Sequence, residues 1–461
     1  MEATTGIRRS WAGLVRPEPL AGAYFWLLVF IFVYWARPED WIPGLVVLPM
    51  AKISGVFALL ALLLSLGSSK RGLFTLPKEV YYLLALDAYL MASALLSPVW
   101  KGGAVFRTLD FFKAWVAVVV IIFAVTNWAR LRRLILLQTG SVILVSAISI
   151  IKGHGQVRLQ SVLKGMYGNP NELAFDIGLI VPFCLAFMLS DRSIVKKATW
   201  AGGTLISIAA LLLTGSRGGF ITLVVAGLFC LWSFAVKGRR PLMFVAAVSL
   251  ALLLFVLAGS TLRRRFAAIS GENITTDVQA SAYGSYEQRQ YLMEVGFRAI
   301  KQHPIFGIGA HNFPTYSGTW RTLHCTFLEI AAEGGIPAFV LFLSFFWCGF
   351  GNLRRAARAP NPDPEIRLFT TAVRGSLIAY LVGGLFAPDA YQFFPLFAVA
   401  YTSVLVVISE HERESLEAPE TIVPKRPWRT LSVYTATSRS NRTYACRSPQ
   451  SVGEWERLDP P

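Results

Sequence analysis

Charged residues are scarce in this chain: Asp, Glu, Lys and Arg make up 15% of its 461 residues, whereas 54% are hydrophobic. This composition excludes a soluble globular domain, because apolar runs of about 20 residues, each long enough to cross a bilayer, recur along the sequence. One long polar interruption lies at about 261–323. The sequence therefore predicts an all-α polytopic membrane domain over 1–410 with one large extramembrane loop, followed by a polar, disordered tail over 411–461.

Cysteine and histidine are also few, at five residues each. The cysteines are scattered and include no C-x-x-C pair, so a disulfide framework is not expected. The histidines match no H-E-x-x-H or H-x-H spacing, and we expect no metal site. The chain also lacks a G-x-x-x-x-G-K-[ST] phosphate loop, a Ser-His-Asp arrangement and a paired-carboxylate motif, and we expect no cofactor.

The apolar pattern divides into about twelve transmembrane helices, at roughly 20–36, 42–66, 79–97, 106–126, 134–151, 172–190, 198–214, 218–236, 241–260, 324–350, 374–388 and 391–409. The net charge is +17, and basic residues such as Lys70, Arg132, Arg192 and Arg239 gather in every second loop. This alternation is the positive-inside pattern, which predicts that both termini are cytoplasmic. Because it explains most of the positive charge, we expect no nucleic acid partner.

On the opposite, outer side, "LLLTGSRGGF" (211–220) places Arg217 between two apolar spans. A guanidinium costs about 2.5–3.5 kcal/mol at the centre of a membrane helix and less near its ends. One interpretation is an arginine that reaches up to the lipid headgroups. The other is an anion site, because Gly215, Gly218 and Gly219 allow close backbone approach and leave amides free beside Arg217, which suits a diphosphate.

The polar loop contains "GSYEQRQYLMEVGFRAIKQHP" (284–304), which predicts an amphipathic helix beginning at Ser285. Ser285 and Gln288 have the spacing of a capping box. Arg289 extends the apolar stripe toward the start of this helix, so it faces whatever the helix docks on, whereas Arg298 points away. The stripe consists of Leu292, Val295, Gly296, Ala299 and Ile300.

His324 stands where the chain re-enters the membrane, in "RTLHCTFLEIAAEGGIPAF" (321–339). It lies on the same predicted side as Arg217 and Arg289, where a histidine can accept or relay a proton near neutral pH. A histidine that only hydrogen-bonds is the alternative. Glu333 precedes Gly334, Gly335 and Pro337, which predict a break in the span, and Glu333 itself caps or pairs locally.

Four stretches together resemble the O-antigen ligase and polymerase superfamily of bacterial inner-membrane glycan transferases. They are "GMYGNPNELAFDIGLIVP" (165–182), "LLLTGSRGGF", the loop helix followed by "HPIFGIGAHNF", and "LHCTFLEIAAEGGIPAF". The resemblance covers about 165–410 and implies a metal-independent glycosyltransferase of the GT-C type in lipopolysaccharide or other polysaccharide biosynthesis. It implies transfer of a glycan from undecaprenyl diphosphate to a hydroxyl of a lipid, glycolipid or protein acceptor, at the periplasmic face of the membrane.

Residue by residue, the resemblance implies that Arg217 and Arg289 bind the diphosphate beside Gly218 and that His324 is catalytic. The supporting residues that lie in its motifs are Asn169, Asn171 and Glu333. The sequence departs from the family after the histidine, where Asn or Ser is common and Cys325 stands here.

Breaking a glycosyl-diphosphate bond develops negative charge on the departing phosphate, which two fixed arginines in a site of low dielectric constant would stabilise. His324 then either deprotonates the attacking hydroxyl or orients the diphosphate. Three more outer basic residues, Arg107, Arg158 and Lys164, either attract the lipid diphosphate or contact headgroups.

Three alternatives remain open. A polymerase of the same superfamily would use another lipid-linked repeat unit as the acceptor. A lipid-linked glycan flippase or an anion transporter would need charged residues along the membrane midplane. The predicted spans contain few such residues, namely Lys52, Asp87, Asp110, Lys113 and Asp176. A purely structural scaffold would leave the outer arginines without a role.

Overall fold

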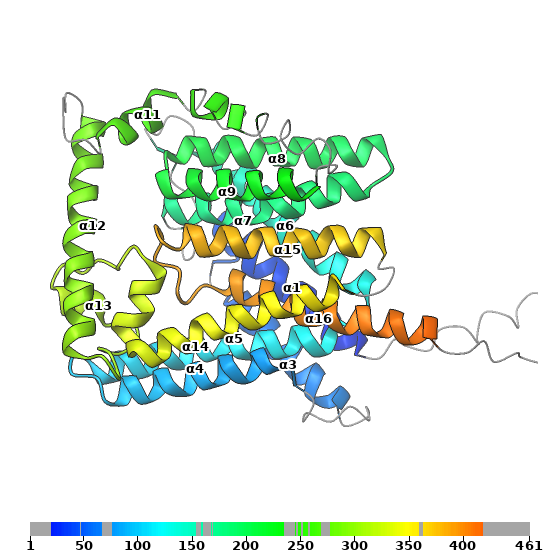
Figure 1. The fold of residues 1–461 in the computed structure, drawn as a ribbon, viewed down its shortest axis with the longest axis horizontal. Helices are drawn as coiled ribbons and strands as arrows, with labels where there is room; N and C mark the ends of the chain where they lie inside the picture. The colour runs from blue at the N-terminus through cyan, green and yellow to red at the C-terminus, as the bar shows by residue number, and fades with distance from the viewer. Residues whose placement is uncertain are drawn as a thin grey trace, which may run out of the picture. The chain divides into compact units, whose positions relative to one another are not determined.

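A computed structural model gives the fold of the chain (Figure 1). It describes residues 20–46, 48–66, 76–153, 158–159, 167, 169–234, 245, 248–249, 252–256, 259–268, 277–358 and 363–417. Across these residues the chain forms helices and no β-strand, as the sequence predicts. Most of the span predicted at 241–260, and the tail beyond 417, lie outside the described residues.

The helices of the N-terminal half are α1 (Ala21–Ala36), α2 (Pro38–Trp41), α3 (Met50–Leu66), α4 (Lys78–Leu95), α5 (Lys101–Ala124), α6 (Trp128–Lys152), α7 (Pro170–Ser190), α8 (Ile194–Thr214) and α9 (Arg217–Phe234). Those that follow are α11 (Gly259–Ala267), α12 (Asp277–Gln302), α13 (Phe313–Ser317), α14 (Thr326–Ala356), α15 (Pro364–Gly383) and α16 (Phe393–Glu417).

Within the described residues, seven helices are long and apolar enough to span a membrane: α6, α7, α8, α9, α14, α15 and α16. Helices α1 and α3 are apolar but shorter. Helices α4 and α5 have sufficient length but carry charges, such as Asp87 in α4 and Arg107 and Asp110 in α5. The structure therefore supports a polytopic helical membrane protein, but it supports seven spans by these criteria rather than the twelve expected.

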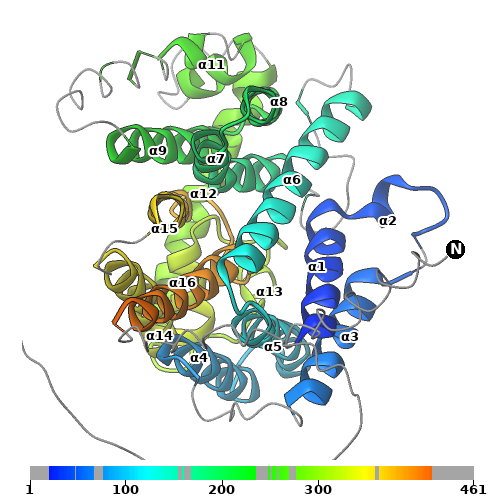
Figure 2. The same ribbon diagram turned by 90° about the vertical axis from the view of Figure 1, so that its right-hand side faces the viewer.

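Helix α7 forms a centre of the packing, with α8, α9 and α15 around it. Figure 2 shows α15 between the group of α7, α8 and α9 and the pair of α14 and α16. Most residues of α7 from Leu173 to Phe187 are buried, as expected for a helix at the centre of a bundle. Two glycines allow α7 and α9 to approach closely, because a Cβ atom on Gly178 would lie 2.7 Å from Thr222 and one on Gly219 would lie 2.5 Å from Ala174. This contact fixes the start of α9 against α7.

Helix α12 runs across the ends of the long helices rather than alongside them, at the left of Figure 1. Its start at Asp277 shows that the predicted start at Ser285 was wrong, and Ser285 lies inside the helix. The preceding segment "DVQASAY" contains helix-forming alanines, which allow the helix to extend toward the N-terminus. The predicted face is confirmed, since Leu292, Val295 and Ala299 are buried and Arg298 is exposed. The residues they pack against are Ile308, Phe313, Leu323, Leu328 and Ala332.

The predicted break in the re-entering span is confirmed at Gly335, which has φ 81° and ψ 175° within α14. The chain that follows α12 docks at this break, where the Ile336 N–H donates a 2.8 Å hydrogen bond to the Pro304 carbonyl. A Cβ atom on Gly335 would collide with the carbonyl of Ile305, so only glycine fits. The docking ties α12 to α14, the helix that follows His324.

Candidate active site

The "TGSRGG" turn joins α8 to α9. Gly215 has a left-handed φ of 61° and ends α8, and α9 begins at Arg217. Ser216 caps α9, because its hydroxyl accepts a 3.2 Å hydrogen bond from the Gly219 N–H. The expectation that the glycine amides are free is therefore wrong for Gly219, whose lack of a side chain instead permits the close contact between α7 and α9. It is also wrong for Gly215, whose N–H donates a 3.1 Å hydrogen bond to the Leu212 carbonyl.

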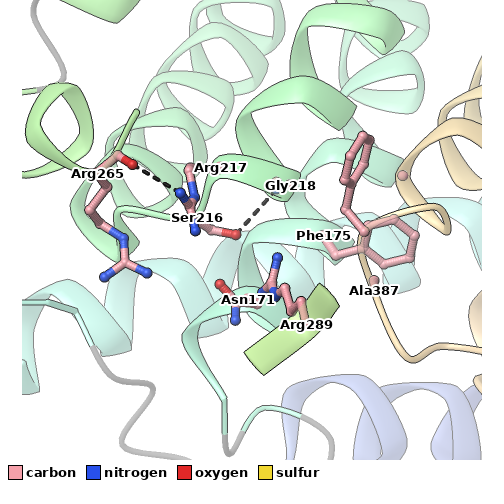
Figure 3. A pocket seen from close by; sticks show the side chains of 11 residues that line it. Asn171, Phe175, Ser216, Arg217, Gly218, Arg265, Arg289 and Ala387 are labelled. Carbon is pink, nitrogen blue, oxygen red and sulfur yellow. Dashed lines mark hydrogen bonds between the residues drawn. The ribbon is translucent and has the colours of Figure 1, made fainter. Parts of the chain in front are cut away.

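A small cavity, called here the first cavity, lies at the start of α9 (Figure 3). Its volume is about 10 Å³, which holds about one water molecule. Arg217, Gly218 and Arg289, which the sequence predicts to act together, lie around this one cavity. The full lining consists of Asn171 and Phe175 of α7, Ser216 to Gly219 of the turn and α9, Arg265 of α11, Arg289 of α12, and Gly383, Phe386 and Ala387 at and beyond the end of α15.

Arg265 is a third arginine of the first cavity, and the sequence did not single it out. Its side chain is buried, at 7% exposed, and its carbonyl accepts a 2.9 Å hydrogen bond from the guanidinium of Arg217. It follows Arg263 and Arg264, which are exposed. The available signal was its spacing from Leu262, since residues three apart share a helix face and Leu262 is buried.

The arginines of the first cavity repel one another. Burial, followed by the charges of Arg158, Arg217 and Arg289, lowers the pKa of Arg265 to about 10. Burial, followed by Arg217 and Arg158, lowers the pKa of Arg289 to about 10. The Nε atoms of Arg265 and Arg289 are buried without a hydrogen-bond partner, and no acidic residue is among the described residues that line the cavity. Because buried cations are normally paired, the arginines around this cavity suit an anion with several acceptor oxygens.

Arg158 joins the cluster from the segment before α7. Its Nε–H donates a 2.8 Å hydrogen bond to the Thr214 carbonyl, and a terminal N–H donates a 3.3 Å hydrogen bond to the side-chain oxygen of Asn171. Burial and the charge of Arg217 lower its pKa. Of the other two outer basic residues considered from the sequence, Arg107 is not part of the first cavity's lining and Lys164 lies outside the described residues.

His324 lies at the start of the re-entering segment, outside the lining of the first cavity but close enough to Arg289 to be affected by its charge. Its Nδ1 is 3.0 Å from the Thr322 carbonyl. Because a carbonyl oxygen only accepts, Nδ1 carries the proton and Nε2 has a free lone pair. Burial, followed by the charge of Arg289, lowers the pKa of His324 to about 4, so the ring is neutral at neutral pH.

The three supporting residues implied by the resemblance have different positions. Asn171 lines the first cavity, and Asn169 caps α7 by accepting a 3.0 Å hydrogen bond from the Asn171 N–H. Glu333 does not line the cavity. Its carboxylate accepts hydrogen bonds of 2.7 Å from the Tyr391 hydroxyl and from the His311 N–H, and so holds the segment after α12 against α14.

Within the described part of the chain, no group of three His, Cys, Asp or Glu side chains is placed to hold a metal ion. The site offers its arginines, the Asn171 side-chain amide and the His324 ring. Together they can bind an anion and accept a proton beside it.

The fold and this cluster define a class: a helical membrane protein with a positively charged site at one end of α7, α9 and α15. Residues 202–343 match the family model described as O-antigen ligase. The matched segment contains Arg217, Arg265, Arg289 and His324. This match supports the resemblance to the O-antigen ligase superfamily that the order of the sequence motifs indicated. No curated protein matches the chain.

Proposed function

We propose that the protein is a glycosyltransferase of the O-antigen ligase type, which transfers a glycan from undecaprenyl diphosphate to an acceptor hydroxyl at the periplasmic face of the bacterial inner membrane. The observation that carries this proposal is the convergence of Arg217, Arg265 and Arg289 on one cavity. The start of α9 adds the partial positive charge of its peptide dipoles. A diphosphate offers several acceptor oxygens to these donors, and the family match supports a reaction that joins glycans.

The arginines act on the leaving group. As the acceptor oxygen bonds to the anomeric carbon, the bond from that carbon to the diphosphate oxygen breaks, and the electron pair remains on the diphosphate. Donors fixed in advance stabilise such charge because they need no reorganisation. Arg217 is fixed by its hydrogen bond to the Arg265 carbonyl, and Arg289 by the docking of the apolar face of α12.

His324 accepts the proton of the acceptor hydroxyl at Nε2. The hydrogen bond from Nδ1 to the Thr322 carbonyl supports this role, because it holds the ring in the tautomer that a general base needs. The charge of Arg289 lowers the pKa of His324, and a diphosphate bound at Arg289 would offset that charge. Donor binding therefore raises the basicity of His324, which favours an order in which the donor binds first.

A transfer assay tests the proposal. The full-length protein in liposomes is supplied with undecaprenyl-diphosphate glycan and a panel of lipid, glycolipid and protein acceptors. We expect release of the carrier diphosphate with glycan on a non-carrier acceptor, lost in His324→Ala and retained in Arg298→Ala, which changes an exposed arginine on the other face of α12. Glycan lengthening on the carrier would instead identify a polymerase of the same superfamily. Normal turnover by His324→Ala would reject the proposed base, and no transfer with any donor would reject the function.

A further inference from the structure

A second cavity lies beside the first and has a volume of about 360 Å³. The two share Arg265, and Arg158 lines the second cavity while it donates a hydrogen bond to Asn171 of the first. This volume falls within the ~300–1,000 Å³ of small-molecule sites. The first cavity, at about 10 Å³, is too small for a sugar. The second cavity is therefore the one of the two with room for a sugar ring beside the diphosphate.

The charge around both cavities exceeds what a diphosphate offsets. Five arginines line them, since Arg321 and Arg158 join Arg217, Arg265 and Arg289, and no acidic residue is among the described lining residues. A lipid diphosphate diester carries one negative charge on each phosphate and leaves most of this positive charge unmatched. Arg265 lies between the cavities with its Nε buried and unpartnered. Arg265 is buried, whereas Arg158 is half-buried and Arg321 is exposed. Burying a cation without a counter-ion is costly, so a second anion would stabilise the cluster chiefly at Arg265.

The rest of the second lining fits a saccharide. Ser281, Ser285 and Gln288 supply groups that donate and accept, as sugar hydroxyls require. Arg158, Arg265 and Arg321 supply donors only, which match the acceptor-only oxygens of a carboxylate or phosphate. The combination suits a sugar that carries an anionic group.

We propose that the second cavity binds an anionic sugar residue of the substrate, one that bears a carboxylate or a phosphate, next to a diphosphate bound by the arginines around the first cavity. This inference rests on the proposed function for the identity of the diphosphate. The sugar belongs either to the donor glycan or to the acceptor, and the same chemistry recognises it in both cases. Arg321 is the residue whose change separates the two cavities, because it lines the second cavity and not the first. Its charge also contributes to the lowered pKa of His324, so each variant is judged by its preference between the two members of a substrate pair.

The first experiment compares kcat/KM for two matched substrate pairs, using the full-length protein in phosphatidylcholine nanodiscs. One pair of donors differs only in a hexose or its uronic acid beside the diphosphate, and one pair of acceptors differs in the same way. We expect the wild type to prefer the uronic acid in one pair by about tenfold or more, the effect of a charge-assisted hydrogen bond. Arg321→Gln removes the preference, measured as the ratio of kcat/KM for the charged and neutral members of each pair, whereas Arg298→Gln retains it.

A binding measurement separates this inference from the proposed function. Glucuronic acid and glucose are titrated onto the protein in the presence of inorganic pyrophosphate. We expect glucuronic acid to bind about tenfold more weakly to Arg321→Gln than to the wild type, with no such difference for glucose. Transfer without preference for either uronic acid, together with equal binding of the two sugars, overturns the second site and leaves the function standing. Binding that depends on Arg321 without transfer from any donor overturns the function and leaves the anionic-sugar site standing.

Discussion

The guanidinium of Arg217 donates a 2.9 Å hydrogen bond to the main-chain carbonyl of Arg265. This bond joins the start of α9 to α11. Its acceptor is an uncharged carbonyl, so it neutralises the charge of neither arginine. The bond fixes the direction of the Arg217 side chain. Because the acceptor is the main-chain carbonyl of Arg265, a substitution of the Arg265 side chain leaves the bond in place. Each arginine of the first cavity can therefore be tested separately.

Arg217→Lys keeps the positive charge but loses the planar set of donors. A lysine cannot reproduce both the bond to the Arg265 carbonyl and a forked contact to a diphosphate. We expect kcat/KM for glycan transfer to fall about 100-fold, the effect of losing one fixed donor to a developing anion. Arg298→Lys, on the exposed face of α12, serves as the matched control. Activity of the Arg217→Lys variant within about twofold of wild type would show that charge alone suffices.

Arg265→Gln should make the unliganded protein more stable. The Arg265 pKa is lowered to about 10 by burial and by three neighbouring arginines, so removing this charge relieves repulsion. We expect an apparent Tm about 1–2 °C higher without anion, if about 1 kcal/mol is regained.

The same variant should gain less from pyrophosphate. At about 100 times Kd a ligand stabilises the native state by about 2.7 kcal/mol, and a weaker Kd reduces this gain. Thermal unfolding with and without pyrophosphate measures both effects. A lower Tm without anion, or an unchanged gain with it, would contradict a repulsive anion site.

The pH dependence of transfer tests His324. Its pKa is lowered to about 4, so the neutral base persists as the pH falls below the usual histidine pKa of about 6.5. We expect kcat/KM, which reports the free enzyme, to fall only as the pH drops through about 4. The decline in kcat should begin at higher pH, because bound diphosphate offsets the charge of Arg289 and raises the pKa of His324.

His311 provides the control for this profile, since burial and the charge of Arg107 lower its pKa to about 4 as well. The kcat/KM of His311→Gln should fall at the same acidic pH as that of the wild type, because the His311 ring stacks on Tyr391 rather than facing Arg289. Both histidines also reduce stability at low pH, since the unfolded chain binds protons below about 6.5 that the folded chain binds only near 4. Folding is therefore monitored at each pH. A limb at about 6.5 in kcat/KM would reject the lowered pKa of His324.

Gly219→Ala should disrupt the site through packing. The added Cβ atom would lie 2.5 Å from that of Ala174, so α9 must move away from α7 and carry Arg217 with it. We expect loss of transfer and a lower Tm. Gly227→Ala is the matched control in the same helix, since its Cβ atom would meet nothing within 4 Å. Equal behaviour of the two variants would show that the close contact between α7 and α9 has no role in the site.

Local patterns predicted the features that depend on neighbours along the chain. The stripe from Leu292 to Ile300 placed Arg289 on the buried face of α12 because helical periodicity is a local property. The break at Gly335 followed from adjacent glycines for the same reason. The predicted start of α12 was wrong. A capping pattern at Ser285 does not begin a helix where the residues before it are helical as well.

The sequence by itself determined the membrane class, the superfamily motifs and the candidate residues Arg217, Arg289 and His324, since hydrophobicity, short motifs and periodicity are written along the chain. Only the tertiary structure decided which of three consecutive arginines enters the site, because burial of Arg265 depends on how α11 meets α9 and α12. It also decided that Arg158 bridges two cavities. These contacts join residues from 158 to 387, and their formation depends on α12 crossing the ends of the long helices, which no local pattern encodes.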